Sequence, residues 1–367
     1  MTVDVLREEL GEVLRAGVDE PLPEYRFQEL ALGVFRHQYE TNPVYRALCR
    51  RRGAEPGELS SWEDVPPVPT RAFKEVPLVS GPGDRVERIF RTSGTTGGRG
   101  HRGEHHVVDL ALYHEALLPN FRAHLLPDEA RLPFVSLIPP GPEVPDSSLS
   151  HMVEVGARYL AAPGGGWFVD AGGHLRFRDL TATLEDLAAE GRPVLVLATA
   201  FALVHWFERL ESEGRRHRLP SGSRLMETGG FKGRSRQLSR DELYRTIHRL
   251  LGIPPERVVN EYGMTELLSQ FYEPTLREPH GPRRHVPPPW VRTRVLDPTT
   301  LEPLPDGRSG ILAHFDLANL HSVAHVLTED QGVVEGDGFR VLGRASGAEP
   351  RGCSLAMDEL MAARRQA

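Results

Sequence analysis

The stretch Arg91-Thr92-Ser93-Gly94-Thr95-Thr96-Gly97-Gly98 decides how this sequence is interpreted. It follows an apolar segment, 86–90, whose pattern predicts a strand. Hydroxyl side chains alternate here with glycines, and such a loop can turn several backbone N–H groups toward one anion. A Walker P-loop is excluded, because no Gly-Lys-Ser/Thr ending follows. We expect phosphate binding, with an ordinary polar turn as the alternative. The expected ligands are Thr92, Ser93, Gly94, Thr95, Thr96 and Gly97.

In the sequence around this loop, short apolar segments typical of strands alternate with segments of helical periodicity. This alternation predicts an α/β sheet with helices on its faces. The predicted strands include 134–138, 194–198, 224–227 and 258–261, and the predicted helices include 107–126, 181–190, 201–214 and 239–251. We divide the chain into a helical and proline-rich segment packed on the core (1–85), an α/β nucleotide-binding core (86–284), a small antiparallel β subdomain (285–344) and a short tail that carries Cys353 (345–367).

Length and composition exclude several classes of protein. The chain has 367 residues, enough for two domains, and a net charge of −7, which disfavours nucleic acid as a partner. Two distant cysteines form neither a disulfide framework nor a zinc cluster. The first residues lack the apolar core of a signal peptide, and no stretch approaches 18 apolar residues. We therefore expect a cytoplasmic protein without a membrane span.

A second motif lies at 260–266 and combines an aromatic ring with a carboxylate. It reads Asn260-Glu261-Tyr262-Gly263-Met264-Thr265-Glu266. An aromatic face suits a purine, and a hard oxygen ligand suits Mg²⁺ beside phosphates. The alternatives are a core aromatic for Tyr262 and a solvated carboxylate for Glu266. Further on, Asp330 follows Thr328-Glu329, and Arg344 follows Gly343 at the end of a predicted hairpin; for Arg344 the alternative is a surface salt bridge.

In this order the motifs resemble those of adenylate-forming (ANL-type) enzymes, the superfamily of acyl-CoA synthetases, firefly luciferase and peptide-synthetase adenylation domains. The resemblance implies a large N-terminal α/β domain with mixed sheets and a small β subdomain, and it implies ATP and Mg²⁺ as cofactors. It further implies that Tyr262 packs on adenine, Thr265 meets the α-phosphate, Glu266 holds Mg²⁺, and Asp330 and Arg344 bind the ribose. Glu329 stands where the superfamily has glycine.

Other segments are similar to one branch, the acyl-protein synthetases of bacterial bioluminescence (long-chain-fatty-acid–luciferin-component ligases). These segments are Phe73-Lys74, 145–152, 227–235 and 351–355. The resemblance implies that Gly229 and Gly230 line the adenine. It further implies that Glu261 and Gly263 of the second motif are among the residues that bind the cofactor. It also implies that His151 borders the acid pocket and steers the carboxylate, with a satisfied core histidine as the alternative.

By resemblance, related enzymes continue after the Gly-Arg motif into a lid domain that supplies a lysine for adenylation. Only 23 residues follow Arg344, and none is a lysine, so we expect a chain without the lid. Lys232 could neutralise phosphate or carboxylate charge instead; the alternative is a solvated surface lysine. Cys353 lies nine residues after Arg344, and nine extended residues span about 30 Å. Its thiol could attack an acyl-adenylate, or it could be a small buried hydrophobe.

These observations predict an ATP-dependent acyl-protein synthetase. It would activate a carboxylic acid, by resemblance a fatty acid, as acyl-AMP, and form a thioester on Cys353 for delivery to a partner such as an acyl reductase. Two alternatives stay open. One is a ligase that passes acyl-AMP to an external amine or thiol, such as a carrier protein. The other is a nucleotide-binding regulatory protein without catalysis.

Overall fold

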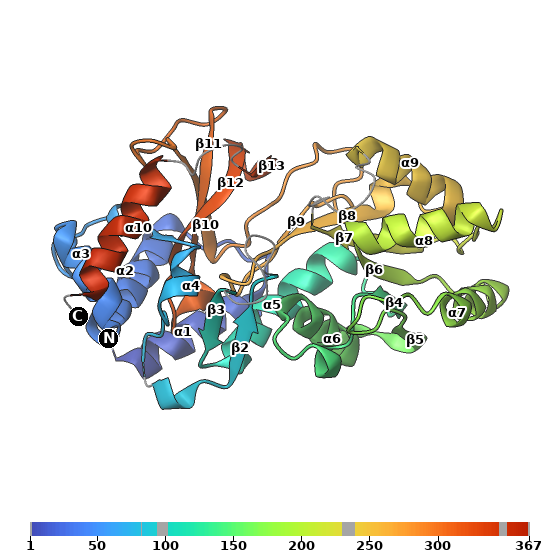
Figure 1. The fold of residues 1–367 in the computed structure, drawn as a ribbon, viewed down its shortest axis with the longest axis horizontal. Coiled ribbons are helices and arrows are strands. Elements are labelled where there is room, and N and C mark those ends of the chain that lie inside the picture. The colour runs from blue at the N-terminus through green and yellow to red at the C-terminus, as the bar shows by residue number, and fades with distance from the viewer. Residues whose placement is uncertain (1, 82, 94–101, 230–238, 345–350, 366–367) are drawn as a thin grey trace. The chain divides into compact units, whose positions relative to one another are not determined.

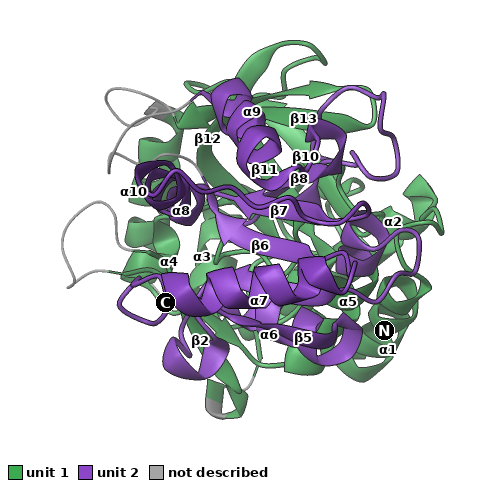
Figure 2. Cartoon of the chain, turned by 90° about the vertical axis from the view of Figure 1, so that its right-hand side faces the viewer, with its two compact units in different colours: residues 1–119, 264–270, 286–367 green, residues 120–263, 271–285 purple. Residues whose placement is uncertain are grey.

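The structure is a computed structural model that describes residues 2–81, 83–93, 102–229, 239–344 and 351–365 (Figure 1). It contains two compact units, coloured separately in Figure 2. Unit 1 comprises residues 1–119, 264–270 and 286–367, and unit 2 comprises residues 120–263 and 271–285. The chain therefore passes between the units several times, and each unit is described by itself below.

Unit 2 is built on a six-stranded sheet in which β9 alone runs antiparallel to its neighbour among the described strands. The strand order is β5 (Ala162–Trp167), β4 (Pro133–Leu137), β6 (Leu195–Thr199), β7 (Arg224–Thr228), β8 (Val258–Tyr262) and β9 (Phe271–Tyr272). The sequence of β6, Leu-Val-Leu-Ala-Thr, is a continuous apolar run, as expected for a strand covered on both faces. Because the carboxyl ends of parallel strands meet at one edge, the segments after β7 and β8 lie at the same edge of this sheet.

Four helices pack on the strands of unit 2, namely α6 (Ser148–Leu160), α7 (Phe177–Ala189), α8 (Ala200–Ser212) and α9 (Arg240–Leu251). A shared core forms where α7, α8 and α9 bury leucines and aromatic residues against β6 and β7. Helix α9 begins with a capping box in which Ser239 and Glu242 satisfy each other's backbone N–H groups. Helix α6 was not among the predicted helices, because its sequence was assigned to a motif.

Unit 1 contains a second sheet of five strands, in the order β1 (Val68–Pro69), β12 (His325–Glu335), β11 (Ser309–Asp316) and β10 (Val291–Leu296), with β13 (Gly338–Arg344) paired to β12. All of these pairs are antiparallel except β1 with β12. The predicted β subdomain is thus present, and it also receives a short strand from the proline-rich segment. A separate hairpin, β2 (Arg88–Arg91) with β3 (Glu104–Val107), flanks the phosphate-loop sequence.

The helices of unit 1 come from both ends of the chain. Three of them, α1 (Val3–Ala16), α2 (Glu24–Thr41) and α3 (Pro43–Arg51), form the N-terminal part, and α4 (Ala72–Glu75) follows β1. The last helix, α10 (Arg351–Arg364), lies beside α3 (Figure 1). Helix α5 (Leu110–Leu125) carries the chain from unit 1 into unit 2. Among the described residues, none of the helices combines the length and apolar character that a membrane crossing requires.

The predicted strands and helices of 86–284 are found within a few residues of their expected bounds. The short tail expected at 345–367 contains a helix, α10, which begins at Arg351. Cys353 lies in the first turn of α10, so the expectation that the chain is extended up to this residue is wrong for residues 351–353. The four-part division of the chain stays a prediction, and the compact units group residues differently, with 86–119 joined to the N-terminal and C-terminal segments.

The pairing of β4 with β5 depends on a glycine. A Cβ added at Gly165 would lie 2.1 Å from the carbonyl oxygen of Phe134 and 2.7 Å from its nitrogen. Gly165→Ala is expected to lower the free energy of unfolding by roughly 1–3 kcal/mol, because one strand must move away from the other. Gly83→Ala is the control, since nothing lies within 4 Å of its Cβ position. Urea titration of both variants tests this, and equal midpoints would contradict it.

Candidate active site

The second motif is divided between the two units. Tyr262 and Gly263 end β8 in unit 2, whereas Thr265 and Glu266 belong to the segment 264–270 of unit 1. The predicted phosphate and metal ligands of this motif are thus held by a different sheet from the predicted adenine contact.

Asp316, at the end of β11, holds the segment 264–270 in unit 1. Its Oδ2 accepts the backbone N–H groups of Leu268 (3.1 Å) and Ser269 (3.0 Å), and its Oδ1 accepts the Ser269 hydroxyl (2.8 Å) and the Ala318 N–H (3.0 Å). Burial raises the pKa of Asp316 to about 6, against these hydrogen bonds, which stabilise its charged form. Beside it, the Asn319 amide donates to the carbonyl of Glu266 (2.9 Å).

The hairpin β2–β3, which carries the first residues of the predicted phosphate loop, contacts the same segment. Thr92 and Ser93 follow β2, and the Thr92 hydroxyl accepts the Gly103 N–H (2.9 Å), which closes the base of the loop. From β3, the buried His105 ring bonds the carbonyl of Thr265 through Nδ1 (2.7 Å). Burial lowers the pKa of His105 to about 4, so a neutral ring donates this bond. The other predicted phosphate ligands, Gly94, Thr95, Thr96 and Gly97, lie outside the described residues.

Glu266 is buried, with 8% of its surface exposed, and charged side chains of both signs lie near it. Burial raises its pKa to about 7, the charges of Arg344 and Lys74 lower it, and that of Glu329 raises it. Among the described residues there is no group of three carboxylate, histidine or cysteine side chains able to enclose a metal. One carboxylate fits Mg²⁺ that arrives with ATP, since Mg²⁺ takes most of its ligands from phosphates and water.

Asp330 and Arg344 are neighbours across the β12–β13 pair, where they stand opposite each other. The Arg344 guanidinium lies 3.8 Å from Asp330 and 3.8 Å from Glu329. Its side chain is half exposed, so such pairs contribute at most about 1 kcal/mol to stability. The pair predicted to bind ribose is therefore together, but its role stays a prediction.

In unit 2, Glu261 joins the segments that follow β7 and β8. Its Oε2 accepts the Thr228 hydroxyl, and its Oε1 would lie 2.3 Å from a Cβ at Gly263, so a larger residue there would displace the Glu261 carboxylate. Burial raises the pKa of Glu261 to about 7. Gly229 follows directly, with a φ of 78° that favours glycine. Gly230 and Lys232 lie outside the described residues.

A buried hydrogen-bond network near these segments connects residues of β7, β8 and α9. Glu227 accepts from the Tyr244 hydroxyl (2.9 Å) and the Asn260 amide (2.6 Å), and Asn260 bonds the His285 ring (2.7 Å). Burial raises the pKa of Glu227. The Tyr262 ring packs on Phe271 and His285, with centroids 5.7 Å away in each case. Tyr262 is only half-buried, so part of its ring is available to a ligand.

Cys353 lies in the core of unit 1, with 2% of its surface exposed. Its thiol donates to the Thr328 carbonyl (3.8 Å) and packs among apolar residues of β10, β11 and α10. Helix α10 is held to α3 by packing and by an ion pair from Arg52 to Glu359 (2.7 Å). The described arrangement is therefore one in which the thiol is covered.

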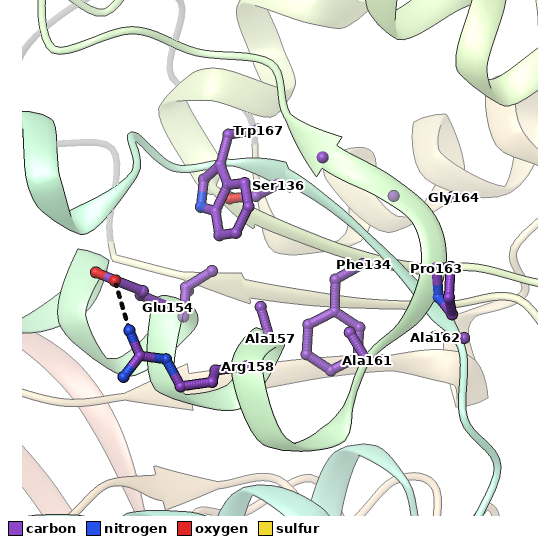
Figure 3. Close-up of a pocket in the computed structure, with 13 residues that line it drawn as sticks. Phe134, Ser136, Glu154, Ala157, Arg158, Ala161, Ala162, Pro163, Gly164 and Trp167 are labelled. Carbon is purple, nitrogen blue, oxygen red and sulfur yellow. Dashed lines mark ion pairs between the residues drawn. The ribbon is translucent and has the colours of Figure 1, made fainter.

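Helix α6, which carries His151, lines a pocket of about 370 Å³ against β4 and β5 (Figure 3). His151 is half-buried and is not among the lining residues. Phe134, Ala157 and Ala161 give an apolar wall, and Trp167 closes one side. The apolar residues of β6 and most of those of α8 do not line this pocket, because they pack in the core of unit 2.

Sequence reasoning missed three residues that organise the site. Neither His105 nor Asp316 is among the predicted site residues, and Lys74 enters the sequence analysis only as part of a family segment. A sequence signal existed for His105, because buried and partly exposed residues alternate along β3, the strand that follows the predicted phosphate loop. No such signal existed for Asp316. Its carboxylate accepts the backbone N–H groups of Leu268 and Ser269, which lie 47 or more positions away in the sequence.

Glu261 predicts a defined pH dependence of stability. A carboxyl whose pKa is raised from 4.5 to about 7 stays neutral in the folded protein while it ionises in the unfolded chain. Folding stability is therefore lost as pH rises from 4.5 to about 7. Glu261→Gln mimics the neutral form, so it should match the wild type below pH 4.5 and exceed it by roughly 3 kcal/mol above pH 7. Urea unfolding across this range measures the difference, and a difference independent of pH would contradict the assignment.

Comparisons with known proteins agree with this geometry. An open conformation of 2-hydroxyisobutyryl-CoA ligase, in complex with 2-HIB-AMP and CoA, has a TM-score of 0.62 at 18% identity, and the match covers 89% of this chain and 71% of that one. The same ligase in its thioesterification state has a TM-score of 0.63. The predicted adenylate-forming α/β fold with mixed sheets is confirmed.

Relatives by sequence point to one branch of that fold. A long-chain-fatty-acid–luciferin-component ligase of Vibrio harveyi is 26% identical over 350 residues, which cover 91% of this chain and 88% of the relative. That of Aliivibrio fischeri is 21% identical over 344 residues, with 90% and 87% covered. The family model described as acyl-protein synthetase, LuxE, matches residues 20–362. The chain belongs to the acyl-protein synthetase family.

Proposed function

We propose that this protein activates a fatty acid with ATP and transfers the acyl group to its own Cys353. The observation that carries the proposal is the family match over residues 20–362. The relatives named above are ligases of long-chain fatty acids, which favours an acid of that class as substrate. The thioester would then pass to an acyl-acceptor protein, such as an acyl reductase.

In the first step, a carboxylate oxygen attacks the α-phosphorus of Mg·ATP. The bond from this phosphorus to the oxygen bridging the β-phosphate breaks, and pyrophosphate leaves. Thr92 and Ser93 start the loop proposed to hold the phosphates, and Thr265 and Glu266 come from the segment held by His105 and Asp316. Positioned charges that face a transferring phosphoryl group lower the barrier most, because they need no reorganisation during the reaction. Mg²⁺ would favour the ionised Glu266 over the neutral form that burial favours.

In the second step, the Cys353 thiolate attacks the acyl carbonyl, and AMP leaves with the electrons of the anhydride bond. The thiol is covered in the described arrangement, so this step requires α10 to move away from the sheet of unit 1. The contacts that oppose the movement include the hydrogen bond to the Thr328 carbonyl, the apolar neighbours and the ion pair of Arg52 with Glu359. Two further hydrogen bonds hold the helix, from the Gly352 N–H to the Pro298 carbonyl and from Arg364 to the Glu75 carbonyl (2.9 Å each).

We further propose that the pocket between α6 and β5 holds the apolar chain of the acid (Figure 3). Its volume of about 370 Å³ falls in the range of small-molecule sites. Ser136 and Trp167 are paired partners toward the carboxyl ends of β4 and β5, at the same edge of the sheet as Thr228 and Glu261. Phe134 lies deeper along β4, so the pocket extends from that edge into the apolar side of the sheet.

Mass spectrometry of the intact protein tests the acyl acceptor. After incubation with Mg·ATP and a long-chain acid, we expect a mass increase equal to one acyl group, which hydroxylamine removes. Cys353→Ser should abolish the hydroxylamine-sensitive adduct. Cys49→Ala should retain it, because burial raises the pKa of the Cys49 thiol to about 12 and leaves it unreactive.

An adduct that persists in Cys353→Ser would place the acceptor elsewhere. Acid-dependent pyrophosphate release without any adduct would favour the external acceptor instead.

Filling the proposed chain pocket should change the preference among acids. Ala157→Phe places a ring in the apolar wall, so ATP–pyrophosphate exchange with a long-chain acid should fall about 10-fold or more, while exchange with a four-carbon acid stays near the wild-type rate. Ala182→Phe is the control, because Ala182 is an exposed residue of α7. An equal loss with both acids, or no loss, would contradict the assignment.

A further inference from the structure

Lys74 lies in the short helix α4, beside the hairpin that carries the phosphate loop. A Cβ placed at Gly103 would lie 3.1 Å from Cγ2 of Thr92 and 3.4 Å from Cγ of Lys74. The stem of Lys74 and the side chain of Thr92 therefore border the same backbone position at the base of the loop. The preceding residue, Phe73, packs edge-on against His105 at 5.6 Å, which fixes α4 on β3.

His105 extends this arrangement to the second motif, since it bonds the carbonyl of Thr265. Lys74 is close enough to Glu266 for its charge to act on that carboxyl, as Arg344 also does. Lys74 thus borders one cluster of unit 1 that contains Thr92, the first predicted phosphate ligand, and Glu266, the predicted metal ligand. All of these residues lie in the same compact unit.

The other cations of this cluster are already matched by partners. Arg102 donates to the carbonyls of Thr92 (2.5 Å) and Arg91 (3.1 Å). Arg91 pairs with Glu104 (2.9 Å), and Arg344 lies 3.8 Å from Asp330 and from Glu329. Lys74 is half-buried, yet within the described ranges it forms neither an ion pair nor a hydrogen bond of its ammonium group. Holding an unmatched cation partly out of water is costly, and an anionic ligand would remove that cost.

Resting on the adenylation step proposed above, we propose that Lys74 is a catalytic residue that binds phosphate oxygens of ATP and stabilises the negative charge that develops as pyrophosphate leaves. Its ammonium stays protonated throughout, so no proton is transferred. A compact ammonium suits this task because it can follow the phosphate oxygens as they move.

The chain has only two lysines, Lys74 and Lys232, which allows a direct binding test. The wild-type protein is treated with formaldehyde and cyanoborohydride, with and without Mg·ATP, and methylation of each lysine is followed by peptide mass spectrometry. We expect Mg·ATP to slow methylation of Lys74 at least 5-fold, with adenosine as a control that does not protect. An unchanged rate at Lys74 under saturating Mg·ATP would overturn the proposal, and this test does not depend on any acid being activated.

The catalytic role is tested by acid-dependent ATP–pyrophosphate exchange. Lys74→Ala should lower the exchange rate about 100-fold, and Lys74→Arg should recover part of it, because the charge remains but its shape differs. Arg71→Ala, which removes a positive charge from an exposed residue beside the same helix, should stay within 2-fold of the wild type. Circular dichroism confirms folding of each variant.

Exchange by Lys74→Ala at the wild-type rate would overturn the catalytic role. If the wild type itself exchanges with no acid, the proposed function fails, whereas the methylation test still decides whether Lys74 binds phosphate.

Discussion

The carboxylate of Asp316 is the constraint on which the site of unit 1 depends. It accepts three backbone N–H groups and one hydroxyl, and through them it fixes a seven-residue segment whose neighbours in the chain belong to the other unit. If the carboxylate were removed, the Ser269 and Ala318 N–H groups would lose the acceptor that Asp316 provides, at a cost of about 1–3 kcal/mol per group, whereas the Leu268 N–H would keep its second acceptor, Oδ1 of Asn319 (3.0 Å). Thr265 and Glu266 are presented by this anchor, and the phosphate-loop hairpin reaches the same segment through His105.

Each of the two units contains a different part of the predicted site. Unit 1 contains the charged cluster around Glu266 and the covered thiol of Cys353, whereas unit 2 contains Tyr262 and the buried hydrogen-bond network of Glu227. A thioester cannot form while the thiol packs in the core, and this same burial protects it from solvent oxidants between reactions.

Much of the fold could be predicted from the sequence, because a continuous apolar run such as 195–198 indicates a buried strand within a single segment. Helix α10 could not be placed, since its apolar face is matched by strands far away in the chain. Cys353 shows the limit most clearly. Its motif indicated a function, but only the packing of α10 on β11 reveals that the thiol is covered. The network of Glu227, Asn260 and His285 was likewise hidden, because hydrogen bonds between distant residues leave no periodicity in the sequence.

The most direct test of this account is the Mg²⁺ dependence of acid-dependent ATP–pyrophosphate exchange in Asp316→Asn. An amide cannot accept all four bonds, so Glu266 should lose its fixed position and the Mg²⁺ concentration at half-maximal rate should rise at least 10-fold. Ser269→Ala, which removes one of the bonds, should shift it in the same direction by less. Asp297→Asn, in an exposed turn, is the control. Folded Asp316→Asn protein with the wild-type Mg²⁺ dependence would contradict the account.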